Sequence, residues 1–229
     1  MNKRFKQFNA FTLAEVLITL GIIGIVAAMT MPTLIQNYKK QEYGAKLKKF
    51  NSVMEQAILS SKQDNGEVGE WNKASGDIKD DEGNVDYTAN AAAIKSFVDV
   101  YLLPYIQILE FKEVTTDLEK AYGEAYMVFK DGSYLYLHNG GCLDLAYDIN
   151  GKRPPNEYGK DVFKYVLCNK EYCSRYATES FCRQFTPIFP PFANNRGTAL
   201  DICERYPLTC SQLLKYDNYE FKDDYPYKL

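Results

Sequence analysis

The chain has 229 residues and a formal net charge of −3, with 46% hydrophobic and 14% aromatic residues. This length is sufficient for one hydrophobic core and an additional segment, and the composition is that of an ordinary folded protein. Without residues 1–10, Lys+Arg falls from 27 to 24 against 30 acidic residues, which is a net charge of −6. An acidic chain lacks the basic face of an extended nucleic-acid interface, so nucleic-acid binding is not expected.

The N-terminus combines a basic leader with a long apolar run. Residues 1–10 contain three basic residues and no acid, and Glu15 is the only charged residue of the 25 in 11–35. A helix of that length extends about 37 Å, which exceeds the core of a signal peptide and is long enough to cross a membrane. No A-x-A cleavage site follows the run. Because the basic residues come first, we expect the N-terminus in the cytoplasm and the remainder outside the inner membrane.

Glu15 is unusual because a carboxylate within an apolar span costs roughly 2.5–3.5 kcal/mol on insertion scales. It is therefore expected to have a partner, and residues 11–35 contain no Lys, Arg or His. A cut just before Phe11 would create an α-amino group near Glu15, and the same amine of a neighbouring copy would set the register between copies. Alternatively, Glu15 simply reaches the lipid headgroups from the end of the run.

The sequence FTLAE at 11–15, followed by an apolar stretch, resembles the prepilin motif of type IV pilins and type II secretion pseudopilins. The resemblance implies that a prepilin peptidase/N-methyltransferase cuts between Ala10 and Phe11 and then methylates Phe11. It also makes Glu15 the glutamate of filament assembly and places Pro32 where many of these proteins kink their first helix. The family usually has Gly before the cut, whereas this chain has Ala10, which is also small.

The same resemblance implies partners and a location. The partners are the peptidase/N-methyltransferase, other pilin or pseudopilin subunits, an inner-membrane assembly platform and membrane lipid. The protein would be a single-pass protein of the inner (cytoplasmic) membrane, with its head periplasmic, or extracellular once in a filament. Nucleic acid becomes a partner only if the chain is a DNA-uptake pilin, and no cofactor is implied.

Beyond Pro32 the predicted helix continues but is apolar on one side only. The apolar stripe consists of Leu47, Phe50, Met54, Ala57, Ile58 and Ser61. A polar Asp-Asn-Gly stretch at 64–66 ends the helix. We therefore expect a leader at 1–10, a transmembrane or filament-core half-helix at 11–35, an amphipathic half-helix at 36–63 and an extracytoplasmic head at 64–229.

The head is predicted to contain one more helix and then a sheet. The helix spans 89–103 and ends at Pro104, after a charged loop at 79–86. Residues 125–139 predict a hairpin with a two-residue turn at Asp131-Gly132. Two further strands are expected at 142–149 and 161–168. Four antiparallel strands packed on the first helix make an α+β, pilin-like fold, which is also what the resemblance implies.

The connection from Asp148 to Asp161 has two interpretations. Its oxygen-bearing residues Asp148, Asn150, Asn156 and Asp161 are potential ligands of Ca²⁺, and some major pseudopilins bind calcium in a loop after the sheet. The spacing does not match an EF-hand loop, which requires a further short-spaced ligand and a terminal Glu. The alternative, which we favour, is a stiff connection with a turn at Asn150 and two successive prolines, and no metal.

The six cysteines all lie in the last 88 residues. Their even number, on the far side of a membrane-inserting N-terminus, predicts disulfides in an oxidising compartment that staple the C-terminal region. A zinc site is not expected, because the chain has one His and no CxxC. The candidates are Cys142, Cys168, Cys173, Cys182, Cys203 and Cys210, with Cys203–Cys210 favoured as a local pair. The tyrosine-rich tail at 215–229 is either a contact surface or, as we favour, covered loop and edge strand.

No catalytic motif was found, and the only histidine, His138, is predicted to be a half-buried residue at a strand end without a nucleophile partner. The protein is therefore expected to be non-enzymatic. The sequence predicts a structural subunit of a type IV pilus-like or type II pseudopilus filament, with secretion, adhesion or motility, and DNA uptake all open as roles. The alternative is a singly anchored periplasmic binding protein that does not polymerise; it would show no cut at Ala10.

Overall fold

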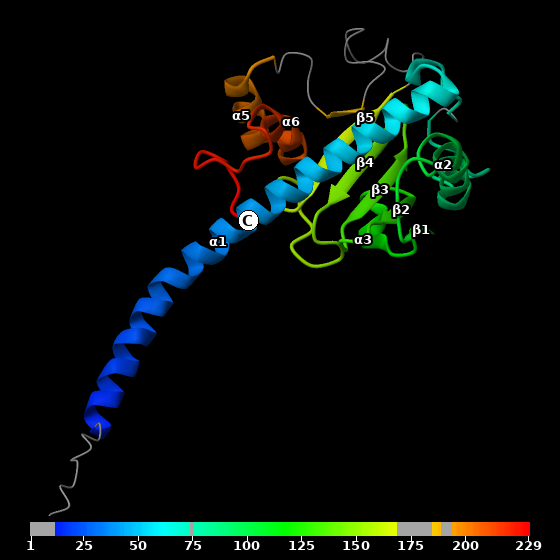
Figure 1. Cartoon of the computed structure of the whole chain (residues 1–229). Helices are drawn as coiled ribbons and strands as arrows, with labels where there is room; N and C mark the ends of the chain where they lie inside the picture. Colours follow the sequence, from blue (N-terminus) through cyan, green and yellow to red (C-terminus); the bar gives the residue numbers. More distant parts are fainter. Residues whose placement is uncertain (1–11, 74–75, 169–184, 189–193) are drawn as a thin grey trace, which may run out of the picture. The chain divides into compact units, whose positions relative to one another are not determined.

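The computed structural model describes residues 12–73, 76–168, 185–188 and 194–229. The chain divides into two compact units, Met1–Lys40 and Gln41–Leu229. The first helix, α1 (Leu13–Asn65), contributes residues to both units and includes Pro32 (Figure 1). The leader at 1–10, Phe11, and the two cysteines at 173 and 182 lie outside the described residues.

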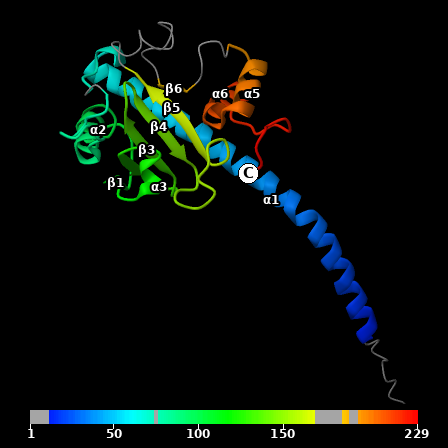
Figure 2. The same cartoon turned by 180° about the vertical axis from the view of Figure 1, so that it is seen from behind.

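The second unit is built on a six-stranded antiparallel sheet with strands in sequential order (Figure 2). Every neighbouring pair of strands is antiparallel. Because the order is sequential, each connection joins adjacent strands. The strands are β1 (Glu110–Glu113), β2 (Ala125–Val128), β3 (Tyr134–Asn139), β4 (Leu143–Asp148), β5 (Val162–Leu167) and β6 (Phe185–Pro187). The four predicted strands are confirmed as β2 to β5, and the short edge strands β1 and β6 were not predicted.

The hairpin between β2 and β3 differs from the prediction in its turn. Phe129 N donates to Ser133 O at 2.9 Å, and Gly132 N donates to Phe129 O at 3.0 Å. Gly132 has φ +79°. Three residues therefore form the loop, the last of them a left-handed glycine, instead of the expected two.

The amphipathic half of α1 packs on one face of the sheet, as its apolar stripe predicts. Phe50 stacks on Tyr147 with ring centroids 3.9 Å apart. Asn51 is buried on the same side of the helix and donates to the Tyr165 hydroxyl at 2.8 Å. The buried residues of the helix are Tyr43, Gly44, Leu47, Phe50, Asn51, Met54, Ala57, Ile58 and Ser61. The α+β fold with a long N-terminal helix on an antiparallel sheet is thus confirmed.

Shorter helices complete the second unit. The predicted helix at 89–103 is α2 (Tyr87–Tyr101), capped by the side chain of Asp86, and it packs on the same core as α1. The four-residue α3 (Asp117–Lys120) precedes β2, and a single 3₁₀ turn, Val68–Glu70, follows α1.

The C-terminal region contains helices that were not predicted: α5 (Arg196–Arg205), a 3₁₀ turn (Pro207–Thr209) and α6 (Cys210–Tyr216). The tail after α6 is a loop without a strand in which Phe221 and Tyr225 are buried, so the expected edge strand was wrong. Arg196 holds it through ion pairs to Asp217 at 2.6 Å and Asp224 at 2.7 Å. The Tyr225 hydroxyl, which is buried, donates to Gly159 O at 2.6 Å.

Candidate functional site

The first turn of α1 is closed by a reciprocal pair of hydrogen bonds between Thr12 and Glu15. Thr12 N and Thr12 Oγ1 each donate to Glu15 Oε2 at 2.8 Å. In return, Glu15 N donates to Thr12 Oγ1 at 3.2 Å. This is a capping box, which satisfies backbone donors that a helix leaves open at its N-terminus.

The capping box gives Glu15 a partner within its own chain, which sequence reasoning missed. The signal was present, because Thr followed three residues later by Glu is the motif of a capping box. The same motif caps α3, where Thr116 and Glu119 make the reciprocal bonds. The Thr12 amide belongs to the Phe11–Thr12 peptide bond, so a cut between Ala10 and Phe11 would leave the box intact.

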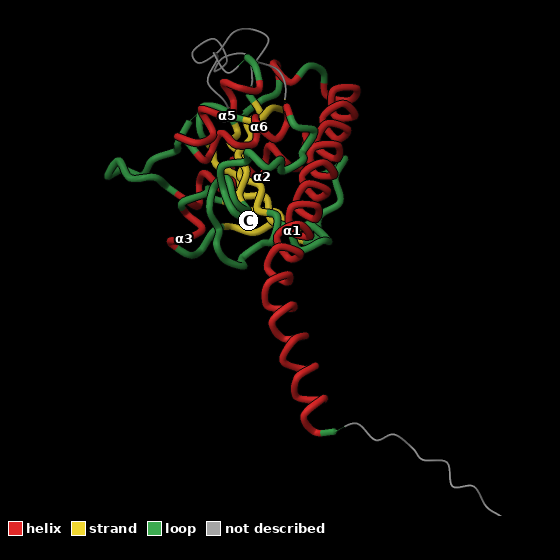
Figure 3. Tube along the Cα trace, turned by 90° about the vertical axis from the view of Figure 1, so that its left-hand side faces the viewer, coloured by secondary structure: helices red, strands yellow, loops and turns green. Residues whose placement is uncertain are grey.

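The remainder of α1 in the first unit has apolar side chains exposed on all sides. Figure 3 shows the course of this part of the helix. It is the one helix of the described part of the chain that is long and apolar enough to cross a membrane. Two of its hydroxyls bond to the backbone of the helix, with Thr19 Oγ1 donating to Val16 O and Thr30 Oγ1 to Val26 O, both at 3.0 Å. The large exposed apolar residues of 12–35 are Leu13, Val16, Leu17, Ile18, Leu20, Ile22, Ile23, Ile25, Val26, Met29, Met31, Leu34 and Ile35. Such a continuous surface needs lipid or other apolar helices around it.

The connection at 148–161 brings its four oxygen-bearing residues together. The Asp161 carboxylate accepts from Asn156 N at 2.9 Å, Glu157 N at 2.7 Å and Asn150 Nδ2 at 3.2 Å. Asp148 Oδ1 accepts from Asn150 N at 3.1 Å. The Asn156 amide, oriented so that its nitrogen faces acceptors, donates to Asp148 Oδ2 at 3.2 Å.

Two properties of this connection bear on its interpretations. Its carboxylates are both held by amides, which fits a stiff connection without metal. However, burial and then the nearby Asp161 raise the pKa of Asp148 to about 8, and the buried Asn150 Oδ1 is among the side-chain atoms without a hydrogen-bond partner in the described part of the chain. A cation would relieve both, so both interpretations stay testable.

His138 is half-buried at the end of β3, as predicted, but it has partners. Its Nδ1 lies 2.8 Å from Glu124 Oε1 and its Nε2 lies 3.7 Å from Asp77 Oδ1. The hydrogen bond to Glu124 raises the pKa of His138. These three residues are of metal-ligating types and lie within 4.8 Å of one another. Because Glu124 is already bonded to His138 and to Asn139 N at 2.9 Å, we interpret the group as a hydrogen-bonded cluster.

Two family models match different parts of the chain. Residues 5–31 match the prokaryotic N-terminal methylation motif. The prepilin motif of type IV pilins and pseudopilins is therefore present. Residues 33–229 match a family of unknown function, DUF6613. The chain belongs to DUF6613. No curated protein and no solved structure matches the chain.

Two disulfides lie in the described part of the DUF6613 region. Cys142–Cys168 joins the residue before β4 to the residue after β5. Cys203–Cys210 joins α5 to α6 and is the local pair that the spacing favoured. Disulfide bonds such as these two persist in an oxidising compartment.

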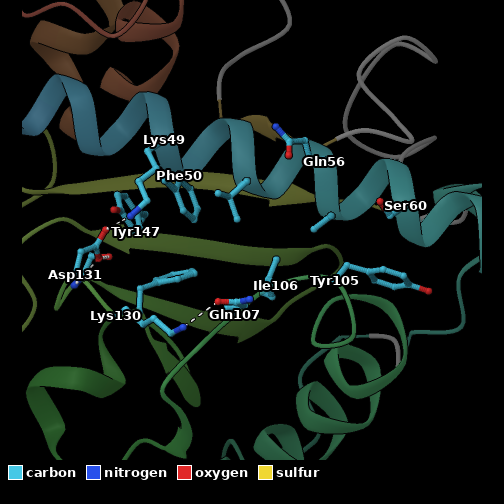
Figure 4. A pocket seen from close by; sticks show the side chains of 14 residues that line it. Lys49, Phe50, Gln56, Ser60, Tyr105, Ile106, Gln107, Lys130, Asp131 and Tyr147 are labelled. Atoms are coloured by element: carbon cyan, nitrogen blue, oxygen red, sulfur yellow. Dashed lines mark hydrogen bonds and ion pairs between the residues drawn. The ribbon is translucent and has the colours of Figure 1, made fainter.

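The DUF6613 region also has a cavity of about 410 Å³. It lies between α1 and the loops before β1 and after β2, with Phe50, Ile106 and Tyr147 on its walls (Figure 4). Polar groups at its rim are paired with one another: Lys49 with Asp131 at 3.1 Å and Lys130 with Gln107 at 2.9 Å. Its volume is within the range of small-molecule sites.

Proposed function

We propose that this DUF6613 protein is a structural subunit of a type IV pilus-like or type II secretion pseudopilus filament. The observation that carries the proposal is the methylation motif at 5–31, continuous with a helix whose apolar side chains are exposed on all sides. In this proposal the chain is stored in the inner membrane as a prepilin. A prepilin peptidase/N-methyltransferase removes residues 1–10 and methylates Phe11.

Assembly would then exchange lipid for neighbouring helices around residues 11–35. An assembly platform in the inner membrane extracts the subunit, and its apolar surface becomes buried among the first helices of other subunits. Within the described residues, the side-chain bonds that Glu15 accepts both go to Oε2, so Oε1 would be the oxygen that pairs with the Phe11 amine of the next subunit. That ion pair would set the rise between subunits.

The remainder of the chain fits an extracytoplasmic head without enzymatic activity. Disulfides persist outside the cytoplasm, and the positive leader would hold the N-terminus on the cytoplasmic side. Glu15 argues against the tip subunit of a secretion system, which usually lacks this glutamate. A large head rich in Cys and Tyr favours a minor or specialised subunit.

The second candidate is a membrane-anchored periplasmic binding protein that does not polymerise. The cavity beside Phe50 supports it, since its volume would accommodate a small molecule. This candidate requires neither a cut at Ala10 nor Glu15.

The deciding experiment is intact mass and N-terminal sequencing of the protein purified from its native membrane. A start at Phe11 carrying one added methyl group is the expected result. An uncut Met1, or a cut near Ala28, would remove the amine that Glu15 needs, and the filament proposal would be abandoned for the anchored binding protein.

A further inference from the structure

A lysine and an asparagine face each other inside the second unit. Lys73 follows the first 3₁₀ turn and Asn139 ends β3. Lys73 is 9% exposed and Asn139 is 1% exposed. Lys73 Nζ donates to Asn139 Oδ1 at 2.8 Å and to Gly140 O at 2.7 Å. A primary amine is therefore held against a side-chain amide where little water reaches.

The Asn139 amide is fixed in one orientation by its other contacts. Its Nδ2 donates to Gly76 O at 3.0 Å and to Asn90 Oδ1 at 2.8 Å. Its backbone N donates to the buried Glu124 at 2.9 Å. The carbonyl oxygen is consequently the part of the amide that faces Lys73, and the carbonyl carbon is one covalent bond away from the oxygen that Nζ contacts.

The surroundings favour the reactive form of the amine. Burial lowers the pKa of Lys73 to about 8, although Asp144, Asp77 and Glu124 oppose the shift. A sizeable fraction of Lys73 is then a neutral amine slightly above neutral pH, and a neutral amine is the form that attacks a carbonyl carbon.

We propose that Lys73 and Asn139 become joined by an intramolecular isopeptide bond. The new bond connects Lys73 Nζ to Asn139 Cγ, and the bond between Asn139 Cγ and Nδ2 breaks. Two protons leave the Lys73 ammonium and end on the departing nitrogen, which is released as ammonium. The reaction requires no oxidant, reductant or further reactant.

The cross-link would tie the segment after α1 to the end of β3, 66 residues along the chain. Unlike the two disulfides, it would resist reduction. A covalent tie between distant segments restricts the unfolded chain, so it would stabilise the second unit whether or not the chain enters a filament. The inference is thus independent of the proposed function.

The test is mass spectrometry of the full-length protein after reduction of its disulfides. We expect an intact mass lower by one ammonia than the mass of the processed or unprocessed chain. Trypsin does not cut after a modified lysine, so the digest should contain a branched peptide joining residues 63–79 to 131–152. Incubation at about pH 9, above the pKa of Lys73, should increase the branched fraction.

A control is needed because Asn139 is followed by Gly140, and an Asn-Gly sequence also loses ammonia by forming a succinimide. Lys73→Arg should abolish the loss, whereas Lys79→Arg, which changes an exposed lysine nearby, should leave it unchanged. An ammonia loss that persists in Lys73→Arg would assign it to the succinimide and overturn the proposal. The proposal would also be overturned if trypsin cuts completely after Lys73 in the wild-type protein after the incubation and no branched peptide is found. This second result does not depend on the folding of any variant.

Discussion

The two halves of α1 are made of similar apolar residues but meet different surroundings. In residues 13–35 the apolar side chains point in all directions and are exposed. In residues 43–61 most of them lie along one side and are buried against the sheet, with Leu47 and Met54 inaccessible to solvent, while Leu59 is exposed. A helix that is apolar all round needs lipid or other helices, whereas a one-sided helix needs a single partner surface. α1 thus carries two patterns, and the change of pattern marks where an apolar surface on all sides gives way to one on a single side.

The largest expected effect separates the two roles of Glu15. Glu15→Ala and Glu15→Val should be processed and stay in the membrane but lose about tenfold or more of filament incorporation, because an ion pair of about 1.4 kcal/mol already corresponds to a factor of ten. Incorporation is measured by quantifying the subunit in sheared filaments. Normal incorporation of either variant would refute the assembly mechanism.

Glu15→Gln and Thr12→Ala are the matched controls. The Gln side chain still accepts from Thr12 N but carries no charge, and Thr12→Ala removes part of the capping box while the charge remains. If assembly depends on the ion pair, Glu15→Gln fails and Thr12→Ala assembles. The opposite pattern would assign Glu15 to capping alone.

A truncation in the buried half of α1 should act on stability instead of assembly. Phe50→Ala removes a ring that packs on Tyr147 and Tyr165, and should lower the free energy of unfolding of the second unit by about 3–5 kcal/mol. Leu17→Ala is the control in the exposed half and should leave that free energy unchanged. Chemical denaturation followed by tryptophan fluorescence reports both, since the single Trp71 lies in the same core. Equal effects of the two variants would contradict the division of the helix.

Loss of the C-terminal disulfide should have a smaller effect. Cys203→Ser with Cys210→Ser opens a short loop, whose closure is worth about 2–3 kcal/mol in the chain-entropy estimate. The double variant should lower the melting temperature of the second unit without changing processing at Ala10. A matched double variant at Cys142 and Cys168 should lower it further, because that pair closes a longer loop, with a separation of 26 residues against 7. If the two double variants lower the melting temperature equally, or the order is reversed, the C-terminal helices depend on the Cys203–Cys210 disulfide more than its loop length suggests.

A further prediction concerns pH and the connection at 148–161. The pKa of Asp148 is raised in the folded state to about 8, so the folded state binds its proton more tightly than the unfolded state. Its stabilising contribution is present below pH 4 and is lost as pH rises towards 8. The melting temperature should therefore fall between pH 5 and 8, and Asp148→Asn should flatten part of this decline. His138, whose pKa is also raised, contributes in the same direction. It should account for part of the decline in melting temperature that remains in Asp148→Asn. An unchanged slope in Asp148→Asn would show that Asp148 is not the group responsible.

Calcium distinguishes the two interpretations of the same connection. A stiff connection without metal predicts equal melting temperatures at pH 8 in calcium and in a chelator. If calcium raises the melting temperature of the wild-type protein but not that of Asp161→Asn, the connection is a cation site, and this result would replace the interpretation that we favour.

Features carried by local pattern could be predicted from the sequence. The prepilin motif, the apolar run, the stripe ending at Ser61 and the β-prone runs of β2 to β5 can all be read from neighbouring residues along the chain. The capping box at Thr12 was equally local, and was missed because Glu15 was considered only in terms of charge. The short elements β1, β6, α5 and α6 gave no clear period, since segments of three to ten residues contain too few repeats to show one.

A membrane-compatible N-terminal helix followed by a sheet-bearing head could be predicted from neighbouring residues, because period and hydrophobicity are local properties of the chain. Tertiary structure alone decided which distant groups meet. Three such pairs, which are separated by 14 to 66 residues along the chain, are Lys73 with Asn139, His138 with Glu124, and Arg196 with the tail carboxylates. No periodicity records such pairs, since they form only when the strands have aligned and the core has excluded water from the groups between them.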